Sequence, residues 1–396
     1  MKDKTISTLT KLEEKRLKNT YNLIASENIP SRDVFEALGS CLSVKYSEGE
    51  IAHRYYTGNK IIDEIEKECK KRLLKLFNCE KDYAANVVVP SGAIANLAVY
   101  TAFLNPGDKI LSLDLKSGSH ISHGLSVNIS GKLYKIINYH LTPDGGIDYD
   151  EVEKIAVKEK PKLIICGYTN FSKVIDFQRF GKIAEISKSL LMVDASHIIG
   201  IIAAGLCPSP FPWADILTST TQKTLKGPRS AFILVKKQYE DKLNKAVFPG
   251  ILGGPKNNEI AAKAICFKEA IQPGFKKYIK NVLENTKYLC DKCKEKGFKI
   301  VGDTTENHLF CLDLSKTGID GRTFANELEK IDIIVNANTI PNDKGTPWKP
   351  QGIRIGCALE TQRGITKKEL DFIANKMLQT LNKLQKSNNL IKFKGG

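Results

Sequence analysis

The chain has 396 residues, 42% of them hydrophobic and 26% charged, which is typical of a globular protein with a substantial core. Its net charge of +16 could indicate a nucleic-acid partner. Basic residues alternate with acidic ones, as in residues 63–68, and no basic tract carries interleaved aromatics, so we expect solvated lysine-rich surfaces and no nucleic-acid binding.

The N-terminal segment, residues 1 to about 20, is charged and amphipathic, and we expect a helix that packs on a partner subunit. The first five residues lack the apolar stretch of a secretion signal. No apolar run in the chain approaches the roughly 20 residues that span a bilayer. We therefore expect a cytoplasmic protein that does not contact membranes.

Two polar motifs follow this segment, Leu-Ile-Ala-Ser-Glu-Asn at residues 23–28 and a tyrosine-rich loop at residues 45–58. The loop contains Glu48, and a carboxylate in a partly dry cleft can carry a raised pKa and move protons. From these residues alone, a polar turn with two half-buried tyrosines is the favoured interpretation.

A Pro-Ser-Gly-Ala turn at residues 90–93 lies between an apolar run, 87–89, and a helical pattern, 94–103. We expect a strand at 87–89. A helix that begins at such a turn offers free backbone N–H groups and a positive dipole end to an anion. An ordinary helix cap would have the same sequence.

The predicted strand 109–113 leads to His120 and His123. This H-x-x-H spacing could indicate a metal site, but no third ligand is suitably spaced, so we expect no metal and a structural role for His123.

Further predicted strands at 163–169 and 190–194 end on polar residues, the second on Asp194 followed by His197. Strands that alternate with helices indicate a mainly parallel sheet covered by helices. Ligands of such sheets bind beyond the carboxyl ends of the strands, where these residues fall.

The stretch 218–229 holds Lys223 after a run of hydroxyl residues and before a Gly-Pro turn, and the strand 231–235 follows. Partial burial with Lys226 and Arg229 nearby would lower the pKa of Lys223 and free its amine for attack on a carbonyl. A surface lysine in a turn is the alternative that this stretch alone would favour.

The pattern of the sequence changes after about residue 270. A helix at 281–296, a strand at 308–314 and a final helix that starts at the capping box Thr366–Glu369 indicate a smaller α/β domain. The single C-x-x-C, Cys290 and Cys293, lies in the helical pattern without a second pair, which favours reduced thiols. We divide the chain into a helical arm 1–45, a large domain 46–270 and a small domain 271–396.

The motifs at 23–28, 45–58, 190–197, 218–229, 248–255 and 335–343, and Arg354, resemble those of the serine hydroxymethyltransferase family over almost the whole chain. The resemblance implies a fold-type-I pyridoxal-phosphate enzyme with a seven-stranded type of sheet and a smaller C-terminal domain. The implied cofactor is pyridoxal 5'-phosphate on Lys223, and the implied co-substrate is tetrahydrofolate. A homodimer with shared active sites, which could pair into a tetramer, is implied as well.

The resemblance also implies residue roles, which we carry over position by position. The implied catalytic residues are Lys223, Glu48, Tyr56, His120 and Asp194. The implied cofactor-binding residues are Ser91, Gly92, Ala93, His120, Thr169, Asp194, His197, Lys223, Tyr46, Gly253 and Gly254. The implied substrate-binding residues are Ser26, Glu48, Tyr56, Arg354 and Asn338, with the Arg354 guanidinium suited to a carboxylate.

The chain departs from the family pattern at several positions near these residues. Gln222 replaces a histidine, Ala93 replaces a serine, and segments 50–52, 230–231 and 357–360 differ from the usual Tyr-Pro-Gly, Gly-Gly and Thr-Pro-Ala. These departures leave open a folate-independent aldolase or transaldolase that uses another aldehyde, or a racemase or aminotransferase on the same fold. A non-catalytic or RNA-binding protein that has kept the fold is a further alternative, but it would not need the set of Glu48, His120, Asp194, Lys223 and Arg354.

Overall fold

The computed structural model describes residues 2–142 and 144–394, with side chains through residue 388. These residues form two compact units, one of residues 26–280 and one that combines residues 1–25 with 281–396. The boundaries at residues 25 and 280 differ from the positions 45 and 270 expected from the composition. At the first boundary, β1 (Tyr21–Asn22) pairs in parallel with β13 (Ile333–Ile334), which ties the N-terminal segment to the C-terminal unit.

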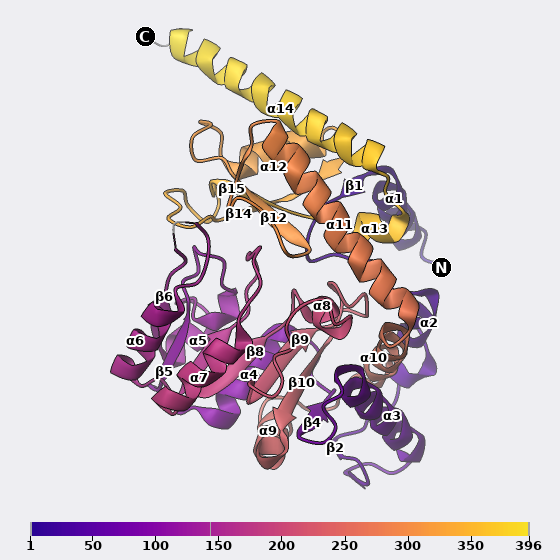
Figure 1. The fold of residues 1–396 in the computed structure, drawn as a ribbon. Helices are drawn as coiled ribbons and strands as arrows, with labels where there is room; N and C mark the ends of the chain where they lie inside the picture. Colours follow the sequence, from indigo (N-terminus) through magenta and orange to yellow (C-terminus); the bar gives the residue numbers. More distant parts are fainter. Residues whose placement is uncertain (1, 143, 395–396) are drawn as a thin grey trace. The chain divides into compact units, whose positions relative to one another are not determined.

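The large unit is built on a seven-stranded sheet in the order β4-β10-β9-β8-β7-β5-β6 (Figure 1). Its strands are β4 (Tyr83–Asn86), β5 (Lys109–Leu113), β6 (Lys135–Tyr139), β7 (Leu163–Cys166), β8 (Leu190–Asp194), β9 (Ile216–Thr220) and β10 (Ala231–Lys236). Pairing is parallel from β6 to β9, and β10 runs antiparallel to both of its neighbours. The predicted mainly parallel sheet is confirmed.

Helices flank this sheet along the chain (Figure 1). They are α2 (Arg32–Leu38), α3 (Lys60–Phe77), α4 (Gly92–Phe103), α5 (Ile129–Leu133), α6 (Tyr149–Glu159), α7 (Phe177–Ser187), α8 (Ile199–Ala203), α9 (Glu240–Val247) and α10 (Asn257–Ala270), with short 3-10 turns at Cys41–Ser43, Ile121–His123 and Lys237–Tyr239. A two-stranded ribbon of β2 (Gly49–Glu50) and β3 (His53–Arg54) lies in the tyrosine-rich loop. The central strands β7, β8 and β9 are almost entirely buried, as expected for strands covered on both faces.

The strand expected at residues 87–89 is wrong, because β4 ends at Asn86 and the three valines follow it as irregular chain. Val87 and Val89 are nevertheless fully buried. The carbonyl oxygens of both residues accept hydrogen bonds from the ammonium of Lys263 and not from a neighbouring strand. A side chain from a distant helix therefore takes the place of ladder bonds here.

The smaller unit holds a four-stranded antiparallel sheet in the order β11-β12-β15-β14. Its strands are β11 (Lys299–Ile300), β12 (Leu309–Asp313), β14 (Asn336–Asn338) and β15 (Gly352–Gly356), and its helices are α1 (Lys4–Asn19), α11 (Pro273–Glu295, which begins in the large unit), α12 (Gly321–Glu329), α13 (Ala358–Arg363) and α14 (Lys367–Lys394). Cys290 and Cys293 are buried free thiols in its core, beside Leu289 and Cys357. The capping box is present, since the backbone N–H of Thr366 donates to the Glu369 carboxylate at 2.8 Å.

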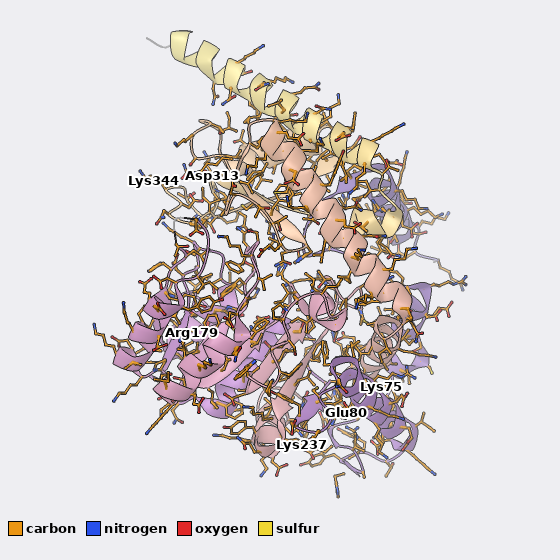
Figure 2. The ribbon with its side chains drawn as sticks, in the orientation of Figure 1. Lys75, Glu80, Arg179, Lys237, Asp313 and Lys344 are labelled. Carbon is orange, nitrogen blue, oxygen red and sulfur yellow. The ribbon has the colours of Figure 1, made fainter. Side chains whose placement is uncertain are left out.

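Charged side chains of both signs cover the molecule, as the labelled Lys75, Glu80 and Lys237 of the large unit illustrate (Figure 2). Many of them form ion pairs one helical turn apart, for example Lys67 with Glu64. Within the described residues, no helix is both long and apolar enough to cross a bilayer. The same residues contain no cluster of three or more metal-ligating side chains.

Candidate active site

Lys223 lies on the loop that joins β9 to β10, and only 8% of its surface is exposed. The loop is closed on itself by Thr221. The N–H of Thr221 donates to the carbonyl of Ser230 at 3.1 Å, and its hydroxyl donates to the carbonyl of Pro228 at 2.5 Å. The N–H of Gly227 donates to the carbonyl of Thr221 at 2.7 Å. The loop therefore has a fixed shape that keeps the lysine out of bulk water.

Two further contacts hold the backbone on either side of the Lys223 side chain. The amide of Asn28 donates to the Lys223 carbonyl at 2.8 Å and to the Tyr278 hydroxyl at 2.7 Å. The hydroxyl of Thr224 donates to the carbonyl of His197 at 2.9 Å. These bonds bring the predicted His197 and the segment that contains Ser26 to the lysine loop. The role of Asn28 was missed, although the residue lies inside the motif at 23–28.

Asp194 ends β8 and is surrounded by hydrogen-bond donors. One carboxylate oxygen accepts from the Asn96 amide at 2.9 Å and contacts His123 Nε2 at 3.0 Å. The other oxygen accepts from the N–H of Ser196 at 3.1 Å and from its hydroxyl at 2.6 Å. The carboxylate is thus oriented from both sides.

These donors determine the charge of Asp194. Burial by itself would raise the pKa of this carboxyl, but the hydrogen bond and charge of His123, with the charge of His120 and the hydroxyl of Ser196, outweigh it. The pKa of Asp194 is held well below its ordinary value, so the group is a carboxylate at neutral pH. A buried anion at the carboxyl end of a parallel strand suits a protonated ring nitrogen.

The two histidines differ in their contacts. His123 is buried, contacts Asp194 directly and lies 3.1 Å from the Ser119 hydroxyl, so its structural role is to hold the carboxylate. His120 is only partly buried, and its Nδ1 lies 2.6 Å from the Ser122 hydroxyl. The Asn96 amide bonds the same hydroxyl at 2.9 Å. Asn96 therefore joins the two histidines to Asp194, a link between distant residues that no local motif indicates.

The turn at residues 90–93 begins α4, with Ser91 as the capping residue and Ala93 exposed in the first turn. A Cβ atom on Gly92 would lie 2.8 Å from the Thr220 methyl carbon, so the turn packs tightly on the end of β9. The Thr220 hydroxyl is buried without a hydrogen-bond partner among the described residues, and so is the Gln222 side-chain oxygen. A cramped helix N-terminus beside an unsatisfied hydroxyl suits a phosphate group.

Thr169 follows β7 and is bonded to the loop before His120. Its hydroxyl donates to the carbonyls of Gly118 at 3.0 Å and Ser119 at 3.2 Å. Thr169 therefore positions the histidine loop, and its expected contact with the cofactor stays a prediction.

The tyrosine-rich loop forms a second group with the Gly-Gly loop. Added Cβ atoms would lie 3.1 Å from the Glu48 carboxylate at Gly253 and 2.9 Å from the Tyr46 ring at Gly254. The rings of Tyr46 and Tyr56 lie 5.5 Å apart and are 57% and 47% exposed. The structure thus brings together five residues that were predicted from two separate motifs, the loop at 45–58 and the segment at 248–255.

Arg54 binds the backbone of the tyrosine-rich loop, a role that no pattern in the sequence indicated. Its guanidinium donates to the carbonyls of Ser47 at 2.9 Å and Gly49 at 2.5 Å, the two residues that flank Glu48. It also pairs with Asp63 at 2.8 Å and with Glu66 at 2.6 Å. The backbone at Glu48 is therefore fixed by one buried cation.

Arg354 and Asn338 lie in the smaller unit, on β15 and β14. The Nε of Arg354 donates to the side chain of Asn336 at 3.1 Å. Burial lowers the pKa of the Arg354 guanidinium to about 10, so an anion bound there would be strongly favoured. The Asn338 amide donates to the carbonyl of Thr339 at 2.8 Å.

Comparisons with known proteins agree with this arrangement. A family model described as serine hydroxymethyltransferase matches residues 1–377. A probable serine hydroxymethyltransferase of Mesomycoplasma hyopneumoniae strain 232 is 48% identical over 376 residues, which cover 94% of this chain and 89% of that protein. A serine hydroxymethyltransferase of Desulfotalea psychrophila is 44% identical over 385 residues, which cover 97% of this chain and 90% of the relative.

Proposed function

The chain belongs to the serine hydroxymethyltransferase family, and from this we propose that it transfers the hydroxymethyl group of serine to tetrahydrofolate, with pyridoxal phosphate held by Lys223. The family consists of fold-type-I pyridoxal-phosphate transferases, and the seven-stranded sheet has the matching architecture. The comparisons support this activity and give no support to the aldolase, racemase or aminotransferase alternatives.

One structural observation supports the site above all others. Asp194 is a buried carboxylate at the end of β8, and Lys223 follows the adjacent strand β9. When bound, pyridoxal phosphate supplies an electron-withdrawing ring that stabilises negative charge on Cα while the Cα–Cβ bond breaks. In this proposal Asp194 keeps a proton on the ring nitrogen, and Lys223 supplies the amine that attaches the cofactor.

The remaining residues of the large unit orient and bind. Ser91, Gly92 and Ala93 present the N-terminus of α4 to the phosphate, and the Thr220 hydroxyl supplies a donor beside it. His120 covers the ring, while Thr169 and His197 bind its oxygen side. Two bonds support these roles, because the Thr169 hydroxyl is bonded to the histidine loop and the His197 carbonyl is bonded to Thr224 of the lysine loop.

The group of Glu48, Tyr46, Tyr56, Gly253 and Gly254 completes the site of a partner subunit in a homodimer, which could pair into a tetramer. Exposed tyrosines beside a carboxylate support this assignment, since large exposed aromatic side chains mark interaction surfaces. Glu48 moves the proton of the substrate hydroxyl or of folate, and Tyr56 contacts the substrate. The compartment is the cytoplasm.

The substrate carboxylate is bound by Arg354 and Ser26, and Asn338 lies on the folate side. A buried guanidinium supports this role because a bound carboxylate offsets the cost of keeping its charge out of water.

The experiment is a product assay on the purified protein loaded with pyridoxal phosphate. Glycine formation from L-serine should require tetrahydrofolate and should be lost in Lys223→Ala. Equal glycine formation with and without tetrahydrofolate would support the folate-independent aldolase instead.

A further inference from the structure

Lys263 is a buried lysine that the proposed chemistry does not use. It lies on α10 with 1% of its surface exposed. Its ammonium donates to the carbonyls of Val87 at 2.5 Å, Ala231 at 2.8 Å and Val89 at 3.4 Å. An ammonium has three N–H donors, so these carbonyls use all of them. Burial lowers the pKa of Lys263 to about 8, which shows how unfavourable this position is for a cation.

The ammonium fills a gap between two strands. The pairing of β4 with β10 ends where Asn86 faces Ile233. Beyond that point the carbonyls of Val87 and Ala231 both turn to the ammonium of Lys263. The side chain therefore fixes the separation of two backbone segments at the point where they part.

Each of these segments leads to a part of the proposed cofactor site. Val89 precedes Pro90 and Ser91, which caps α4 at the phosphate turn. Ala231 follows Ser230, whose carbonyl closes the Lys223 loop through the N–H of Thr221.

The same face of α10 makes two related contacts. The Glu259 carboxylate, one turn before Lys263, accepts from the Ser230 hydroxyl at 3.0 Å. The Cys266 thiol, one turn after it, lies 3.5 Å from the carbonyl of Leu225. Residues at i, i+4 and i+7 share one face of a helix, so a single stripe of α10 supports both segments.

We propose that Lys263 is a positioning residue for the cofactor phosphate, because its ammonium holds the phosphate turn at a fixed distance from the Lys223 loop. This inference rests on the proposed place of the phosphate at Ser91. A buried apolar side chain would fill the same volume but would remove the Lys263 donor from the Val87 and Ala231 carbonyls and free them to shift, while the Val89 carbonyl also lies 3.4 Å from the Ser230 hydroxyl. The turn would then lose its alignment with the phosphate, while the ring site at Asp194 would keep its own contacts.

The test compares the affinity of the apoprotein for pyridoxal phosphate with its affinity for pyridoxal, which lacks the phosphate. Both dissociation constants are measured by equilibrium dialysis for Lys263→Met and for Lys268→Met, an exposed lysine on the same helix. Lys263→Met should raise the dissociation constant of pyridoxal phosphate about tenfold or more and that of pyridoxal about twofold or less. Only pyridoxal phosphate carries the group that binds at the phosphate turn. Lys268→Met should change neither constant.

An equal loss for both ligands would overturn the inference, because a purely structural role weakens the whole site. If Lys263→Met does not fold, Lys263→Gln keeps an amide donor in the same place. The same two dissociation constants are then compared in this variant. Ser91→Ala separates the two levels of the proposal. If the ratio of the two dissociation constants is unchanged in Ser91→Ala, the phosphate site itself is contradicted, and the inference with it. If this ratio is unchanged only in the Lys263 variants, only the inference is contradicted.

Discussion

Replacing Arg54 with methionine tests whether a single buried cation fixes the loop that carries Glu48. The side chain of Arg54 is 4% exposed, and it pairs with Asp63 and Glu66 while binding two backbone carbonyls. Removing one partner of a buried ion pair costs about 3–5 kcal/mol, because the other charge is left without compensation. Lys70 still lies 3.1 Å from Glu66, which places the expected loss of unfolding free energy near the lower end, about 3 kcal/mol.

The assay is urea unfolding of the apoprotein followed by tryptophan fluorescence, with Arg32→Met as the matched control. Arg32 forms an ion pair with Glu36, but its side chain is 89% exposed, so its loss should cost less than about 1 kcal/mol. In a double-mutant cycle, Glu66→Gln should recover part of the loss caused by Arg54→Met, because it removes the uncompensated charge. Additive effects in this cycle would refute the reasoning.

The same cluster predicts a dependence on pH. Burial raises the pKa of Asp63, but the hydrogen bond and charge of Arg54 and the backbone N–H of Ala52 together outweigh it, and the pKa is below its ordinary value of 3.8. A carboxyl with a depressed pKa in the folded state stabilises the protein above its unfolded pKa, and this contribution is lost as the pH falls through the folded pKa. The difference in stability between the wild type and Arg54→Met should therefore shrink below about pH 4. A constant difference down to pH 2 would contradict this assignment.

Three further substitutions have defined outcomes. Asp194→Asn should lower the rate of glycine formation about 100-fold or more while a cofactor absorbance band remains, because the ring loses its anion and Lys223 stays in place; a rate within a factor of two of the wild type would contradict the role. Asn28→Ala should lower the affinity of the apoprotein for pyridoxal phosphate about fivefold, because the Lys223 carbonyl loses its bond from the Asn28 amide. An unchanged dissociation constant in equilibrium dialysis would contradict this role. Thr366→Ala should lower the free energy of unfolding of the smaller unit by about 1 kcal/mol, because the Thr366 hydroxyl no longer accepts from the N–H of Glu369, and thermal unfolding that is unchanged would rule this out.

The elements that surround the site could be predicted because their signals are local. The runs at 109–113 and 190–194 became β5 and β8 with the same bounds, and the Ser-Gly turn does begin a helix. The strand expected at 87–89 was wrong because apolar β-branched residues predict burial as well as a strand. Val87 is buried as expected, but its carbonyl is bonded to the side chain of Lys263, 176 residues further along the chain.

The residues that position the site could not be predicted, because their partners lie on other elements of the chain. Asn96 lies 98 residues from Asp194, and its position on α4 gives no local indication that its amide bonds a carboxylate. Arg54 was part of a recognised motif, but its carboxylate partners lie on α3. Ser196 could have been found, since a serine two residues after an aspartate commonly bonds its carboxylate.

The most direct test of the central claim is to identify the lysine that holds the cofactor. The purified protein is loaded with pyridoxal phosphate and reduced with borohydride, which makes the attachment permanent, and the labelled peptide is identified by mass spectrometry. We predict one labelled peptide that contains residues 218–229, with the label on Lys223 and no label in Lys223→Ala. A label on another lysine, Lys263 included, or no stable label at all would contradict the assignment of the active site.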